Sequence, residues 1–213
     1  KMTSDNYHEI ETGYTKDKDG SLKIAILTSM PNVTPVMWHW WFGWHGDQSN
    51  KYKLWHPKAH VSAQWKDGIE NKIAYINRTS MIQEYIGTKL EKANIHFIEP
   101  SILGIHSADV NKEVFICARL GYTKIPVDFG YLVHQVRVID GGSEMRSRFW
   151  IGGKHISIRG NNVFTNLASA ILQKLVKLPE QRAIDLLTHC SEEMNHLAKF
   201  LPQLYAEFHK PSL

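Results

Sequence analysis

The sequence has few cysteines and no long apolar segment, and both shortages narrow the classes of protein to consider. Two cysteines, Cys117 and Cys190, among 213 residues exclude a disulfide scaffold and are typical of a reducing compartment. No apolar run reaches the roughly 18 residues that a membrane-spanning helix needs. Residues 1–14 are polar, so we expect neither a signal peptide nor an anchor. We therefore expect a cytoplasmic protein without a membrane partner.

A strongly basic segment is also missing. The 25 lysines and arginines are balanced by 21 aspartates and glutamates, which leaves a net charge of +4 spread along the chain. No basic run carries interleaved aromatic residues, so we expect no nucleic-acid partner. No repeat or low-complexity linker divides the chain, and 43% hydrophobic residues suffice for one core. We predict a single domain over residues 1–213, with residues 1–20 as a polar lead segment.

A histidine and a glutamate stand one helical turn apart in the most amphipathic part of the sequence. His189 and Glu193 are four residues apart, so on an α-helix they share a face. Apolar residues recur around them every three or four positions, centred near Cys190, which places the pair at the interior edge. Burying a carboxylate without a partner is costly. Either the two side chains pair with each other, or both bind a divalent metal.

The clearest local structure is a hairpin in which residues 131–139 and 143–151 flank Asp140-Gly141-Gly142. The two glycines supply the positive φ angles of a tight reversal. Alternating patterns predict further strands at residues 21–29, 79–86, 95–98 and 113–120.

Three helices are expected. One opens at Thr34-Pro35, one covers residues 163–177, and a long one follows Pro179 and should kink or end at Pro202. These elements predict an α+β fold in which a curved antiparallel sheet wraps a long C-terminal helix.

His134 is the single polar residue on one face of the first hairpin strand. Leu132, Val136 and Val138 share that face with it, because alternate residues of a strand point the same way. Such a histidine is either a core residue bonded to a backbone carbonyl or a cavity-facing group that binds substrate or transfers protons.

Several aromatic-rich blocks follow one another in a recognisable order. The sequence resembles the 2,4-diacetylphloroglucinol hydrolase family, which includes phloretin hydrolase, from about residue 30 to residue 208. The resemblance rests on residues 34–37 (TPVM), 40–45 (WWFGWH), 52–57 (YKLWHP) with His60, 84–87 (EYIG), 145–152 (MRSRFWIG), and 189–194 (HCSEEM) with 200–202 (FLP).

The resemblance implies a helix-grip (Bet v 1-like) fold and a zinc-dependent hydrolase. The enzymes of this family cleave the carbon–carbon bond between a phenolic ring and its acyl group. Two histidines and two glutamates bind the Zn2+, and carried over to this chain they are His60, Glu84, His189 and Glu193. Glu91 is a weaker candidate than Glu84. Considered without the family, His56 competes with His60 as a ligand.

The reaction implied is of the retro-Claisen type, in which water attacks the acyl carbonyl and the ring carbon leaves. The family places a tyrosine hydroxyl near the substrate, which corresponds to Tyr52, and His134 is our candidate proton donor or relay. The substrate is expected to be a small acylphenol held by Trp41, Trp44 and Phe149. A homodimer is possible. The alternative function is a metal-free helix-grip carrier of hydrophobic or aromatic ligands.

Overall fold

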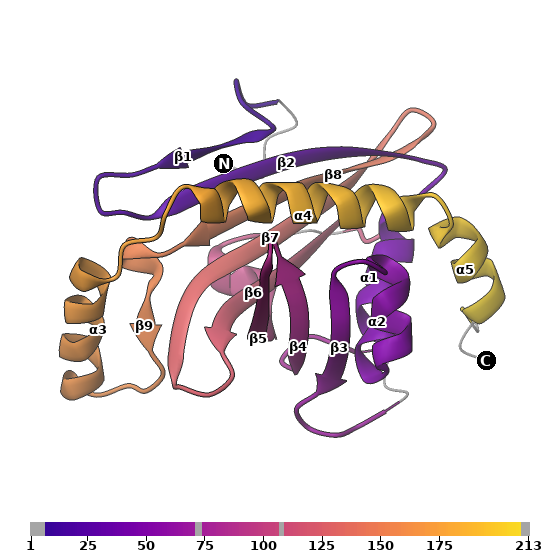
Figure 1. The fold of residues 1–213 in the computed structure, drawn as a ribbon. Helices are drawn as coiled ribbons and strands as arrows, with labels where there is room; N and C mark the ends of the chain where they lie inside the picture. The colour runs from indigo at the N-terminus through magenta and orange to yellow at the C-terminus, as the bar shows by residue number, and fades with distance from the viewer. Residues whose placement is uncertain (1–6, 71–73, 107–108, 210–213) are drawn as a thin grey trace.

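The computed structural model of the protein describes residues 7–70, 74–106 and 109–209. A long helix, α4 (Gln181–Ala198), lies across a strongly curved antiparallel sheet (Figure 1). In sheet order the strands are β1 (Gly13–Lys16), β2 (Leu22–Pro31), β8 (Gly142–Ile151), β7 (Val127–Ile139), β6 (Glu113–Tyr122), β5 (Lys89–Ile98), β4 (Thr79–Ile86) and β3 (His60–Trp65), and the short β9 (Ser157–Ile158) pairs with β7.

The helices gather at the two ends of the sheet. On one side α1 (Pro35–Trp44), α2 (Ser49–Trp55) and α5 (Leu201–Phe208) lie near the C-terminal end of α4, and on the other α3 (Val163–Leu175) precedes it (Figure 1). Short 3-10 turns complete the chain at η1 (His45–Asp47), η2 (Pro100–Leu103) and η3 (Gly153–His155). As predicted, the helical run is broken before Pro202, because α4 ends at Ala198 and α5 starts at Leu201.

The predicted α+β fold is confirmed, and every predicted strand is present. β5 extends beyond the predicted residues 95–98. Two elements beside the candidate site were not predicted. α2 has only seven residues, and β3 is short with a register shift after His60, so neither carries a clear periodic pattern.

Residues 1–20 are not merely a polar lead, which corrects that prediction for the part that is described. β1 pairs with β2, and the Glu11 carboxylate receives hydrogen bonds from Arg146 and Arg148 on the outer face of β8. The side chain of Arg146 is fully buried, so its charge requires a carboxylate. Residues 1–6 of the segment lie outside the described ranges.

The main core lies between the concave face of the sheet and α4. Cys190, Met194 and Leu197 of α4 are completely buried against inward-facing residues of the strands. His134 lies on this inner face, opposite Ile116 of β6. Within the described ranges no helix is both long enough and apolar enough to cross a membrane.

Candidate metal centre and cavity

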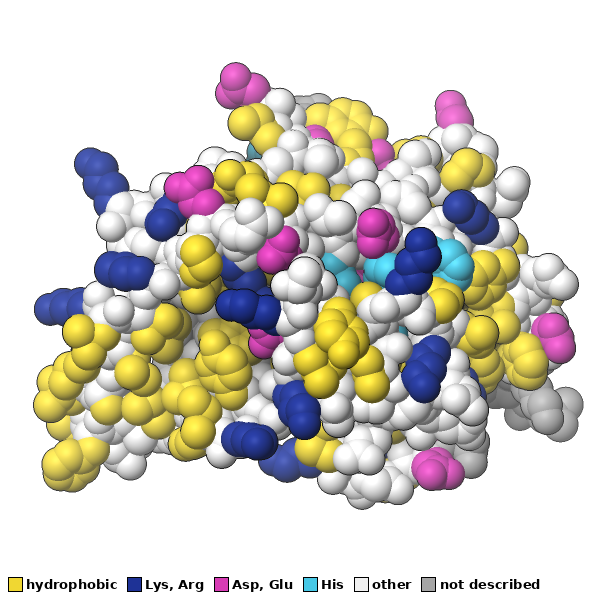
Figure 2. Space-filling view, viewed as in Figure 1, with side chains coloured by type: hydrophobic (Ala, Val, Ile, Leu, Met, Phe, Trp, Pro, Cys, Tyr) yellow, Lys and Arg dark blue, Asp and Glu magenta, His cyan; other side chains and the backbone are white. Residues whose placement is uncertain are grey.

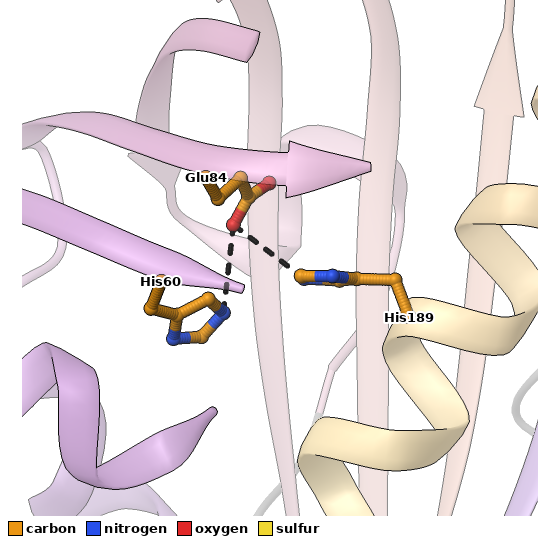
Figure 3. A group of neighbouring side chains, drawn as sticks. All are labelled: His60, Glu84 and His189. Carbon is orange, nitrogen blue, oxygen red and sulfur yellow. Dashed lines mark ion pairs between the residues drawn. The ribbon is translucent and has the colours of Figure 1, made fainter. Parts of the chain in front are cut away.

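Two histidines and two glutamates from three separate elements meet beneath α4. His60 begins β3, Glu84 lies on β4, and His189 and Glu193 project from α4 (Figure 3 shows the first three). The ligand atoms of His60, Glu84 and His189 all lie within 4.8 Å of one another. Glu193 completes the group, with its Oε2 3.3 Å from His60 Nε2 and 3.7 Å from His189 Nε2.

Strand register and helix periodicity explain this convergence. His60 and Glu84 are direct cross-strand partners, and the irregularity of β3 comes immediately after His60. The Oε2 of Glu84 lies 3.6 Å from the Nε2 of both His60 and His189. His189 and Glu193 share the buried face of α4 because they are one turn apart. His60 thus becomes a neighbour both of Glu84, 24 positions later in the sequence, and of Glu193, 133 positions later.

His60 is held in one orientation by Tyr52. Its Nδ1 lies 3.0 Å from the backbone carbonyl of Tyr52, which can only accept a hydrogen bond, so Nδ1 carries the proton. The Tyr52 ring stacks on the imidazole, with ring centroids 3.8 Å apart and planes inclined by 4°. Nε2 is therefore the nitrogen directed toward the carboxylates, where it can bind either a proton or a metal ion.

The Nε2 of His60 is buried and has no hydrogen-bond partner in the described part of the chain. The two carboxylates that face this nitrogen need positive charge beside them, either a proton on the imidazole or a metal ion. Imidazole nitrogens and carboxylate oxygens are ligands that Zn2+ accepts, and a ligating histidine commonly donates its other N–H to a backbone carbonyl. The four residues therefore fit a zinc ion.

The charges of the site depend on whether a cation is present. Burial alone would lower the pKa of His189, but its hydrogen bond to Glu84 and the charges of Glu84 and Glu193 raise it to about 9. Burial alone would raise the pKa of Glu84, but His189 and His60 lower it to about 2. Without a metal the protonated His189 thus offsets part of the carboxylate charge, and a divalent cation bound in place of that proton would balance both carboxylates.

The competing ligand candidates lie outside the group. His56 Nε2 is 3.1 Å from Glu192 Oε2, although its ring centroid is only 5.1 Å from that of His189. Glu91, the cross-strand partner of Glu84, forms an ion pair with Arg182 at 2.8 Å. Of the two glutamates considered, Glu84 faces the histidines.

A cavity with a volume of about 100 Å³ adjoins the site. Its wall includes Glu84, His189 and Glu193 together with three other candidates from the sequence, Tyr52, His134 and Phe149. The Tyr52 hydroxyl donates a hydrogen bond to Glu84. Six of the predicted site residues therefore surround one space, and the fourth metal-ligand candidate, His60, stacks on the ring of Tyr52.

His134 faces the cavity instead of being satisfied by a backbone carbonyl. Its Nδ1 lies 2.7 Å from the Ser147 hydroxyl oxygen on β8. The Phe149 ring packs edge-on against the imidazole at a centroid distance of 6.0 Å. Burial lowers the pKa of His134 to about 3, so the side chain is uncharged at neutral pH.

Trp41 and Trp44 are not among the residues that line this cavity, which corrects their predicted substrate contact. Trp41 is fully buried and stacks on His45 at 4.9 Å, whereas Trp44 stacks on Trp40 at 5.0 Å. Helix α1 is apolar around most of its circumference, so its aromatic rings pack against one another and against α5.

His45 is a cavity-lining residue that the sequence interpretation missed. Its Nδ1 donates to the Trp41 carbonyl oxygen at 2.7 Å, one helical turn back, and burial lowers the pKa to about 4. The signal available was its position at the end of the aromatic block at residues 40–45, four residues after Trp41.

The fold and the site together define a helix-grip protein with a candidate His/Glu metal centre at the wall of an internal cavity. The model of the DAPG hydrolase PhiG domain matches residues 1–206, so the chain belongs to this family and is a hydrolase. The resemblance inferred from the aromatic blocks is thereby confirmed.

Curated relatives and a solved structure agree with this assignment. A 2,4-diacetylphloroglucinol hydrolase of Pseudomonas sp is 31% identical over 95% of this chain and 73% of that protein. The phloretin hydrolase of Eubacterium ramulus is 28% identical over 97% of this chain and 75% of that protein. The crystal structure of Ara h 8.0201 covers 86% of this chain and 99% of its own with a TM-score of 0.51, and at 11% identity it shows the fold alone.

Proposed function

We propose that this protein is a zinc-dependent hydrolase that cleaves the carbon–carbon bond between an acyl group and a phloroglucinol-type ring. The observation that carries the proposal is the buried, unpartnered Nε2 of His60 facing the carboxylates of Glu84 and Glu193. The names of the relatives, diacetylphloroglucinol hydrolase and phloretin hydrolase, supply the substrate class. Acylphenols are planar and mostly apolar, as the cavity wall requires.

His60, Glu84, His189 and Glu193 would hold the zinc ion. When bound, zinc supplies Lewis-acid chemistry, by polarising a substrate oxygen or by lowering the pKa of a water ligand toward ~7. Two carboxylates balance the charge of a divalent cation. Tyr52 supports the set twice, because its carbonyl orients His60 and its hydroxyl orients Glu84.

The reaction would proceed as a retro-Claisen cleavage. Water adds to the acyl carbonyl carbon, the bond from this carbon to the ring breaks, and the ring carbon keeps the electron pair as an enolate stabilised by the phenolic oxygens. A proton then adds to the ring carbon, which leaves a carboxylic acid and the deacylated phenol. The cavity must therefore place a proton source beside the ring.

His134 and Ser147 are suited to supply that proton as a relay. The imidazole is uncharged at neutral pH, so it can pass a proton between Ser147 and the substrate without first becoming an imidazolium in the resting enzyme. The Tyr52 hydroxyl lines the same cavity and is placed to orient a substrate oxygen. Phe149 would pack against the phenolic ring.

Family membership favours this enzyme over a metal-free carrier of aromatic ligands, which the same fold could also form. A carrier has no need for four convergent metal ligands. The decisive experiment combines elemental analysis of the purified protein with product analysis after incubation with diacetylphloroglucinol and phloretin. We expect about one zinc per chain and release of the carboxylic acid.

The matched variants are Glu193→Gln and Glu192→Gln, which change adjacent carboxylates on the same helix. Glu193 faces the candidate ligands, whereas the Glu192 side chain is 60% exposed and contacts His56. We expect Glu193→Gln to lose zinc and turnover, and Glu192→Gln to retain zinc. A protein that contains no zinc after growth in zinc-supplemented medium, or full activity of Glu193→Gln, would refute the proposal.

A further inference from the structure

A second and larger cavity adjoins the one beside the candidate metal centre. Its volume is about 410 Å³, against about 100 Å³ for the inner cavity. It lies between α3, the first turn of α4 and the ends of the central strands. Pockets that enclose a small organic ligand usually measure roughly 300–1,000 Å³, and the outer cavity lies within this range.

The two cavities share part of their walls. Six residues belong to both walls: Ile86, Glu91, Tyr122, Phe129, Ile151 and Arg182.

An ion pair and an aromatic pair form the neck between the cavities. Glu91 and Arg182 are 2.8 Å apart and bring β5 to α4 at this point. The rings of Tyr122 and Phe129 pack beside them with centroids 4.9 Å apart. The shared wall between the inner and the outer cavity thus includes these four side chains, and a ligand that reached both cavities would pass between them.

The far wall of the outer cavity is apolar. Leu172 of α3 lines it, together with Val176 and Leu178 of the connection to α4. Leu178 packs so closely on Gly152 that a Cβ there would lie 2.7 Å from Leu178 Cδ1, and Gly152 has a φ of 75°. The absence of a side chain at Gly152 therefore lets the segment between α3 and α4 pack closely enough to line the cavity. The polar ligands of the metal centre line the inner cavity only.

We propose that the outer cavity binds the apolar tail of the acyl group, so that the natural substrate is a phenol with a long alkyl or arylalkyl ketone. This inference rests on the proposed function. The phenolic ring occupies the inner cavity beside Tyr52 and His134, with the acyl carbonyl at the metal centre and the tail passing between Glu91 and Tyr122. An acetyl group ends within the inner cavity and leaves the outer one unused.

The test fills the outer cavity and compares two substrates. Leu172→Trp and Val176→Phe add bulk to its wall, and Leu175→Trp is the matched control on the same helix. Leu175 is 73% exposed and belongs to the apolar outer surface of α3, visible at the lower left of Figure 2. The substrates are phloretin, which carries an arylpropanoyl tail, and monoacetylphloroglucinol.

We expect both filling variants to lower kcat/KM for phloretin at least tenfold, a typical effect of altered apolar fit, and to change that for monoacetylphloroglucinol less than twofold. The control should match the unsubstituted protein on both. If the filling variants do not fold, Leu172→Ala replaces them and should raise KM for phloretin alone.

An equal loss on both substrates, or no loss on phloretin, would overturn the inference while leaving the proposed function intact. If the unsubstituted protein cleaves neither compound, the proposed function fails instead. Calorimetry can then measure the affinity of the filling variants and of the control for phloretin. If the filling variants bind phloretin as tightly as the control, the inference that the outer cavity binds the acyl tail is refuted.

Discussion

Replacing Glu11 by glutamine tests how the N-terminal segment is fastened to the sheet. Burial would raise the pKa of Glu11, but hydrogen bonds from Arg146, the His8 backbone and Arg148 outweigh it and lower the pKa from 4.5 to about 2. At about 1.4 kcal/mol for each pH unit, and after a discount for solvent screening at this partly exposed carboxylate, the carboxylate form contributes on the order of 1–2 kcal/mol of stability. We expect Glu11→Gln to lower the free energy of unfolding by about this amount at pH 7, because two buried arginines lose their counter-charge.

The pH dependence distinguishes this explanation from a simple packing defect. Because the pKa is lowered on folding, the contribution of Glu11 is complete above pH 4.5 and is lost as the pH falls toward 2. Urea unfolding followed by circular dichroism at pH 7 and pH 3 should therefore show a smaller difference between Glu11→Gln and the unsubstituted protein at pH 3. Glu9→Gln, at an exposed neighbouring position, is the control. An equal difference at both pH values would refute the reasoning.

Three further perturbations test the site and its scaffold. Tyr52→Phe removes the hydroxyl that orients Glu84 and should weaken zinc binding about 10–100-fold, measured by chelator competition; unchanged affinity would contradict this. His134→Gln should retain zinc and slow cleavage about 100-fold without changing the shape of the rate profile between pH 5 and 8, because its lowered pKa keeps the imidazole uncharged there; loss of zinc would show it to be a ligand. Gly46→Ala would make Cβ overlap the Trp65 ring and should cost about 1–3 kcal/mol in urea unfolding, so a change below about 0.5 kcal/mol would mean that the ring moves freely.

The parts of the fold that the sequence predicts are those with strong local signals. The hairpin of β7 and β8 follows from alternation around Asp140-Gly141-Gly142, and α4 follows from its apolar spacing and Pro202. β3 and α2 escape prediction because they are short and because their side chains serve the site more than a regular core face. β1 escapes because it is short and polar, and Glu11, just before it, pairs with Arg146 of β8, which lies far along the chain.

The candidate site divides in the same way. His189 and Glu193 can be paired from helical spacing, whereas His60 and Glu84 require either a family resemblance or the cross-strand register of β3 and β4. Trp41 could not be assigned correctly, because stacking among aromatic rings around an apolar helix has no periodic pattern. The role of His45 as part of the cavity wall depends equally on tertiary packing.

The separation of the four candidate ligands in the chain has a consequence for biogenesis. β3 is the last strand of the sheet and pairs only with β4, while α4 follows all the strands in the sequence. A nascent chain that has made the sheet but not yet docked α4 offers only His60 and Glu84 to the ion. If the proposed zinc ion is bound, its tight capture must await the docking of α4, so that only the fully folded chain would hold the metal.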